Sequence, residues 1–186
     1  MVSKVNLKLK LQKSRTLYNR GNVSYALFLN NATVESVDLS DNDLTGAFGI
    51  FAKLTRLTTL VLRNCSLLQL SQLSWANPKS VLKLDFSSNG LVRVDYDSLK
   101  TLTSLEYLDL SSNRIVTFDS RLFENREVIN SLKHLNLAYN LIVSLDMVLF
   151  NMVNLQTLNI GTSMRNVLTN RLKFLSNFEF DSNLLI

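Results

Sequence analysis

One eleven-residue pattern recurs along the chain and limits the folds that this sequence can adopt. Leucine or another apolar residue occupies positions one, four, six and eleven of most copies, and asparagine usually occupies position nine. Copies begin near residues 34, 57, 81, 105, 132, 155 and 175, at intervals of 20 to 27 residues. A single copy cannot bury its own apolar side chains, so neighbouring copies must stack and share one core. The sequence therefore predicts a solenoid of about seven coils.

Each copy contains a short alternation of apolar and polar residues, which is typical of a β-strand with one buried face. In the fourth copy, Leu108 and Leu110 are expected to face the core, while Tyr107 and Asp109 face outward. The residue at position nine follows the strand, where an asparagine amide can pair with backbone groups that would otherwise be buried and unpaired. These ladder positions are Asn42, Cys65, Asn89, Asn113, Asn140 and Asn183. Cys65 is expected to be a buried structural thiol, the alternative being a reactive or interchain cysteine.

The pattern, the period near 24 residues and the late phenylalanines Phe123 and Phe150 resemble the typical class of the leucine-rich-repeat family. The resemblance covers residues 34–186 and implies an α/β solenoid. A curved parallel sheet would line its concave face, with loops and short helical turns on the convex face. The class is frequent in extracellular receptors and insect immune proteins. The resemblance thus implies protein–protein recognition outside the cell or at its surface, in innate immunity or signalling.

Both ends of the chain differ from the repeats. Residues 1–33 carry six of the 20 basic residues and no acid, and the alternation from Val5 to Leu11 predicts a strand with a basic outer face. We expect this segment, with a second strand-like run at Tyr25 to Leu29, to form an N-terminal cap; the alternative is an arm that binds nucleic acid or membrane. No signal peptide is visible. The chain stops after the seventh copy without a cap, so we expect a fragment, or a partner chain or further domain that covers this end.

The outward residues of the strands form the predicted binding surface. We expect a protein ligand to contact central positions of the concave face, where acids lie on the middle line and Tyr107 is the candidate anchor. The predicted contact residues are Lys83, Asp85, Tyr107, Asp109, His134, Asn136 and Tyr139. The competing interpretation of Asp85 and Asp109 is that they are ordinary solvated strand residues, because Leu-Asp-Leu-Ser-Ser-Asn is a common wording of such repeats.

Other functional classes find little support in the sequence. Catalytic motifs of the nucleophile-elbow, P-loop and zinc-protease types are missing, and one histidine and one cysteine predict neither a metal site nor a cofactor. We therefore expect no enzyme, and neither nucleic acid nor membrane as the main partner. The alternative function is an intracellular scaffold or regulatory protein, which the single cysteine favours.

Overall fold

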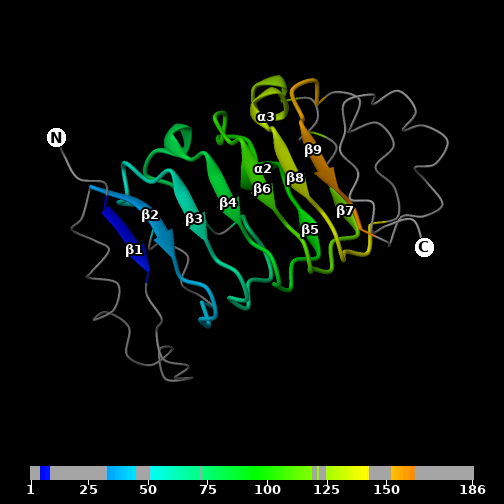
Figure 1. Cartoon of the computed structure of the whole chain (residues 1–186), viewed down its shortest axis with the longest axis horizontal. Coiled ribbons are helices and arrows are strands. Elements are labelled where there is room, and N and C mark those ends of the chain that lie inside the picture. The colour runs from blue at the N-terminus through cyan, green and yellow to red at the C-terminus, as the bar shows by residue number, and fades with distance from the viewer. Residues whose placement is uncertain are drawn as a thin grey trace.

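The computed structural model describes residues 5–8, 33–44, 51–71, 73–118, 121, 125–142 and 152–161 (Figure 1). Its main feature is a seven-stranded parallel sheet in which each strand pairs with the strand of the next coil. In spatial order the strands are β1 (Val5–Lys8), β2 (Val34–Asp38), β3 (Thr59–Val61), β4 (Lys83–Asp85), β6 (Tyr107–Asp109), β8 (His134–Asn136) and β9 (Thr157–Asn159). The predicted α/β solenoid with a parallel sheet is confirmed.

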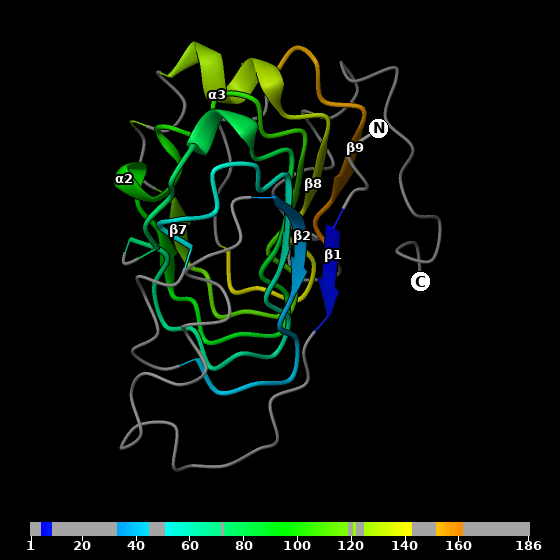
Figure 2. The same cartoon turned by 90° about the vertical axis from the view of Figure 1, so that its left-hand side faces the viewer.

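The remaining elements of the described chain are short and lie away from the sheet. They are the 3-10 helix η2 (Pro78–Ser80), β5 (Arg93–Val94), α2 (Tyr96–Leu99), β7 (Thr117–Phe118) and α3 (Arg126–Ser131). Figure 2 shows the coils end-on, with the sheet on one side and α2 and β7 on the opposite side. Strands β5 and β7 pair with each other in a second, two-stranded parallel sheet.

The alternation within each strand separates the core from the outer surface. Leu108 and Leu110 of the fourth copy are buried, as are their counterparts Leu84 and Phe86 in the third. The late apolar position of the third copy, Leu99, is also buried. Because each coil contributes such residues, the core runs continuously through the stacked coils, which is how solenoids bury apolar surface.

Asparagines after the strands connect successive coils. The Asn89 amide Nδ2 donates to Leu62 O of the preceding coil at 2.8 Å and to Phe86 O of its own coil at 2.9 Å, and its Oδ1 accepts from Leu67 N at 3.0 Å. Asn113 and Asn140 repeat this arrangement in the next two coils. Each side chain thus satisfies buried backbone groups of two coils.

Cys65 takes the ladder position in the second coil with different chemistry. Its Sγ is fully buried and donates to Leu39 O at 3.1 Å and Arg63 O at 3.4 Å. A thiol is a weaker acceptor than the amide oxygen of asparagine. The backbone N of Leu44 in the preceding coil therefore donates to the backbone O of Cys65 at 3.1 Å and not to its side chain. Burial raises the pKa of the Cys65 thiol to about 11, so the group is protonated near neutral pH.

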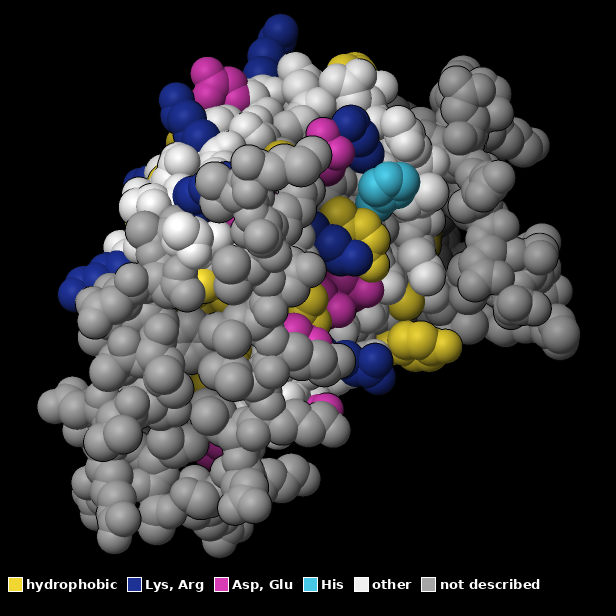
Figure 3. Space-filling model, turned by 60° about the vertical axis from the view of Figure 1, so that its left-hand side comes forward, with side chains coloured by type: hydrophobic (Ala, Val, Ile, Leu, Met, Phe, Trp, Pro, Cys, Tyr) yellow, Lys and Arg dark blue, Asp and Glu magenta, His cyan; other side chains and the backbone are white. Residues whose placement is uncertain are grey.

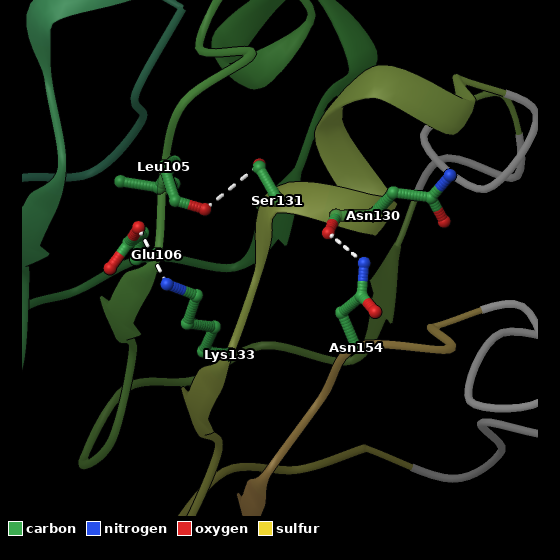
Figure 4. A network of polar contacts seen from close by, with 6 residues as sticks. All are labelled: Leu105, Glu106, Asn130, Ser131, Lys133 and Asn154. Carbon is green, nitrogen blue, oxygen red and sulfur yellow. Dashed lines mark hydrogen bonds and ion pairs between the residues drawn. The ribbon is translucent and has the colours of Figure 1, made fainter.

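The edge at which the strands begin is held by polar contacts between coils (Figure 4). Ser131 Oγ at the end of α3 donates to Leu105 O at 2.9 Å, and Asn154 Nδ2 donates to Asn130 O at 2.8 Å. Lys133 Nζ pairs with Glu106 Oε1 at 2.7 Å across two neighbouring coils. These contacts tie α3 to the coils on both of its sides.

The predicted N-terminal strand lies in the same sheet as the repeats. β1 runs parallel to β2, with Asn6 opposite Ser36 and Lys8 opposite Asp38. Lys8 therefore extends the register column that contains Asp38. The run from Tyr25 to Leu29, the seventh copy with Asn183, and both Phe123 and Phe150 lie outside the described residues.

Candidate functional site

The sheet register brings six of the seven predicted contact residues into one block on three neighbouring strands. Lys83, Tyr107 and His134 are register partners across β4, β6 and β8. Two positions further along the same strands, Asp85, Asp109 and Asn136 are also register partners. Side chains two residues apart in a strand project from the same face, so the block forms a continuous part of the concave surface.

Tyr107 lies at the centre of this block. Its ring centroid is 4.4 Å from Lys83 Nζ and 6.1 Å from the ring centroid of His134. The Tyr107 hydroxyl lies 3.5 Å from Asp109 Oδ2, at the limit of a hydrogen bond. Burial, followed by the charges of Asp109 and Asp85, raises the pKa of Tyr107, so the phenol stays protonated. The neighbours hold the ring in place before any partner arrives, which reduces the entropy lost on binding.

Asp109 is less exposed than an ordinary solvated strand residue. It is 9% exposed, and its Oδ1 accepts from Ser111 N at 2.8 Å and from Ser111 Oγ at 2.6 Å. Its Oδ2 accepts from Asn136 Nδ2 of the next coil at 3.0 Å. The interpretation of Asp109 as solvated is therefore wrong, because donors from its own and the neighbouring coil surround the carboxylate.

The central acids share a local structural role at the ends of their strands. Asp85 Oδ1 accepts from Ser87 N at 2.9 Å and from Ser87 Oγ at 2.6 Å, as Asp109 Oδ1 does from Ser111. Asp38 and Ser40 make the same pair of contacts in the first coil. One carboxylate oxygen of each acid is thus used by a turn of the Asx type. Asp85 forms no ion pair within the described part of the chain, so its negative charge stays available to a partner.

The remaining predicted contact residues differ in position. His134 Nδ1 lies 2.8 Å from Thr157 Oγ1 on β9, which ties the ring to the next strand. Tyr139 does not belong to the central block: it follows the strand, is 70% exposed and has a φ of 57°. The structure therefore brings the six residues of the block together and places Tyr139 at the edge where the strands end.

Exposed apolar side chains at that edge were missed by the sequence reasoning. Leu68 and Val92 are 69% and 53% exposed, and each lies three residues after its ladder position. Leu141, directly after Asn140, is 59% exposed. The available signal was the recurrence of an apolar residue three places beyond the ladder at Leu68, Val92 and Val116, which the eleven-residue template does not include.

Figure 3 shows side chains of both charges gathered around apolar side chains beside the single histidine. Within the described residues, no group of three or more histidine, cysteine or acidic side chains is arranged to hold a metal ion. No helix in the same part of the chain has both the length and the apolarity to cross a membrane. The block is a polar surface of mixed charge with the Tyr107 ring at its centre.

Two family models, both described as leucine-rich repeat, match residues 55–115 and 30–47. Among solved structures, a leucine-rich-repeat protein of Leptospira interrogans is similar with a TM-score of 0.54 and 20% identity, over 85% of this chain and 47% of that one. The TLR13–ssRNA13 complex is similar with a TM-score of 0.60 and 27% identity, over 74% of this chain and 19% of that one. No curated protein sequence matches the chain.

The repeats, the parallel solenoid and these matches show that the chain contains leucine-rich repeats and adopts the leucine-rich-repeat solenoid fold. Domains of this family are protein-recognition modules. The chain spans about half the length of the Leptospira structure and about a fifth of the length of the TLR13 structure.

Proposed function

We propose that this chain binds a protein partner through the concave block of Lys83, Asp85, Tyr107, Asp109, His134 and Asn136. The observation that carries the proposal is the position of Tyr107, a half-buried ring held between Lys83 and His134 on adjacent strands. Tyrosine contributes a large contact area and a polar hydroxyl with little loss of side-chain entropy, and it is enriched among residues that dominate binding energy. A ring already fixed by its neighbours suits such a role.

The charge pattern of the block favours a partner that carries basic groups opposite the middle column. Asp85 and Asp109 lie side by side on β4 and β6, and Asp38 lies in the same column. Complementary charges accelerate encounter and select the partner's orientation. Lys83 in the neighbouring column would repel a uniformly basic surface, so we expect the partner to present both charges.

We further propose that the chain acts outside the cell or at its surface, in signalling of the innate-immune type. The similarity to TLR13 and the typical-class repeat length support this proposal. The alternative is an intracellular scaffold, which would use the same concave surface in a different compartment. The buried and protonated Cys65 suits both compartments, because a thiol of this kind is inert.

RNA is not the ligand that we propose for the concave face, although the TLR13 structure contains a single-stranded RNA. The neighbouring acids Asp85 and Asp109 would repel phosphate groups at the centre of the block. For residues 1–33 we keep the proposal of an N-terminal cap. Fluorescence anisotropy with labelled single-stranded RNA tests whether the full chain binds RNA, and salt-sensitive binding would favour the nucleic-acid interpretation of residues 1–33.

Site-specific photocrosslinking tests the proposed function. A photoreactive phenylalanine analogue replaces Tyr107 in one variant and Arg126, an exposed residue of α3, in the matched control. Each full-length variant is incubated with extracellular fluid or cell extract from the source organism, and crosslinked proteins are identified by mass spectrometry. We expect a specific protein adduct at position 107 and none at position 126. The same adduct at both positions, or only at 126, would contradict the proposal.

A further inference from the structure

A second surface of different chemistry lies along the edge where the strands end. We call it the strand-end edge, and it consists of Leu68, Val92, Arg114, Val116, Tyr139 and Leu141. Backbone hydrogen bonds hold its coils together: Arg114 N donates to Leu91 O at 2.9 Å, Val116 N to Val92 O at 3.0 Å and Leu141 N to Ile115 O at 2.9 Å. The edge therefore runs across four consecutive coils as one surface rather than as isolated side chains.

Four apolar side chains of this edge, Leu68, Val92, Tyr139 and Leu141, are exposed, whereas Val116 is partly buried. Leu68 and Leu141, near its two ends, are 69% and 59% exposed. Leu68 lies over Gly90 of the next coil, where an added Cβ would come within 2.9 Å of Leu68 Cδ2. A row of large exposed apolar residues on a soluble surface marks an interaction site more often than isolated ones do.

Tyr139 adds a conformational argument. The residue before the ladder position has a positive φ in each of the first five coils, and the first four place Asp41, Asn64, Ser88 and Ser112 there. Those residue types tolerate the left-handed region, or are at least small, whereas a bulky aromatic residue is an outlier in it. The fifth coil nevertheless has Tyr139 at this position, exposed, with Leu141 two residues further on. Strain of this kind is concentrated at functional surfaces.

The edge offers one arginine without an acidic partner among the described residues. Residues 64–69, 88–93, 112–117 and 139–142 include no acid and two arginines. Arg93 Nε pairs with Asp95 Oδ1 at 2.8 Å, but Arg114, beside Leu141 in the neighbouring coil, makes no ion pair with any described residue. The edge therefore combines apolar contact area with an arginine able to bind a carboxylate.

The spacing of the coils indicates the shape of the occupant. Parallel strands lie about 4.8 Å apart, so the four coils span about 15 Å. Apolar residues on one face of an α-helix recur every turn of about 5.4 Å, which nearly matches this spacing. Side chains on one face of an extended strand recur about 6.6 Å apart and would lose register. We infer that the strand-end edge binds an acidic amphipathic helix of a partner protein, roughly ten residues long, separately from the concave block.

Fluorescence anisotropy with two designed peptides tests this inference. Both are hydrocarbon-stapled helices with leucine along one face; one carries glutamate and the other lysine on the opposite face. We expect the full chain to bind the Leu–Glu peptide at least tenfold more tightly than the Leu–Lys peptide. Val92→Glu should weaken binding of the Leu–Glu peptide at least tenfold, and Arg114→Glu should reverse the preference. Two control variants should leave the affinity for the Leu–Glu peptide unchanged. They are Thr101→Glu, which adds the same charge at an exposed position away from the edge, and Tyr107→Ala.

Several results would overturn the inference. Equal affinity for the two peptides would show unspecific apolar binding, and equal effects of Val92→Glu and Thr101→Glu would show that the edge is not the site. Loss of peptide binding in Tyr107→Ala would place the helix on the concave block. Concentration-dependent self-association that Val92→Glu abolishes would make a second copy of the chain the occupant. Circular dichroism checks folding, and Leu141→Glu replaces Val92→Glu if that variant does not fold.

Discussion

The concave block and the strand-end edge are built by the same coils, yet they differ in chemistry. In the concave block, polar side chains bond to one another, and Asp109 accepts hydrogen bonds from Ser111 and Asn136. At the edge, Leu68 and Leu141 face solvent, and Arg114 pairs with no acid of the described chain. The difference arises where the strands end: strand residues are aligned with their partners from coil to coil, whereas Tyr139 lies in the turn that follows, at a positive φ.

The largest expected effect concerns the core that supports both surfaces. Leu110→Asp places an unpaired charge among stacked apolar side chains and should cost about 4 kcal/mol of unfolding free energy or more, enough to unfold the chain. Asp109→Asn, one residue away, keeps the oxygen that accepts from Ser111 but loses the one that accepts from Asn136, and should cost about 1 to 2 kcal/mol. Urea denaturation followed by circular dichroism measures both. Equal losses would contradict the alternation that separates the core from the concave block.

A smaller effect is expected from pH at Cys65, which anchors the coil beneath Leu68. The unfolded thiol ionises near pH 9, whereas burial raises the pKa in the folded chain to about 11. The unfolded state therefore loses its proton first, and this contribution to stability, present below pH 9, is lost as the pH rises to 11. The shift corresponds to about 2 to 3 kcal/mol.

The comparison of wild type with Cys65→Ala isolates this contribution, because both proteins share all other titrating groups. Urea denaturation from pH 8 to 11 should show the steeper loss of stability in the wild type. Parallel curves for the two proteins would mean that the thiol is accessible to solvent in the folded chain.

The next prediction separates the two surfaces by binding. Tyr107→Ala should weaken binding of the partner captured at position 107 by about 2 kcal/mol, a roughly thirtyfold loss of affinity, because the central ring supplies contact area. The stability of the chain should change little, since the ring lies outside the apolar core. Isothermal titration calorimetry measures the affinity, with Tyr139→Ala as the aromatic control at the edge. A larger loss in the control would assign this partner to the strand-end edge.

The smallest effect concerns the strain at Tyr139. Tyr139→Asn places a residue that tolerates positive φ at this position and should raise the unfolding free energy by about 0.5 to 1 kcal/mol. The same variant should weaken binding of the Leu–Glu helix, because it removes the exposed ring from the edge. Thermal unfolding and anisotropy measure the two effects. A destabilised variant would show that the ring supports the fold rather than a binding surface.

Sequence periodicity predicted the parts of the molecule in which each residue's surroundings repeat. The alternation around Leu108 predicted the strands, their register and the columns that contain Lys83 and Asp85, because parallel stacking aligns equivalent positions. The burial of Asp109 was not predictable in this way, since it depends on Asn136, which replaces aspartate in the next coil. Leu68 and Val92 were missed because their exposure depends on the turn geometry after the ladder.

The N-terminal segment shows a similar limit. Alternation from Val5 predicted a strand, but alternation is the same for parallel and antiparallel pairing. The parallel register of β1 with β2, which places Lys8 opposite Asp38, depends on the path of the chain between the two strands.

Hydroxyl-radical footprinting tests the central claim, that this chain has two separate binding surfaces, most directly. The method reports the solvent accessibility of individual tyrosine, histidine and leucine side chains in the full chain. With the partner captured at position 107, we expect protection of Tyr107 and His134 and no change at Tyr139 or Leu141. With the Leu–Glu helix, we expect protection of Tyr139 and Leu141 and no change at Tyr107 or His134. Protection of all four residues by either ligand, or protection confined to residues 175–186, would contradict the account.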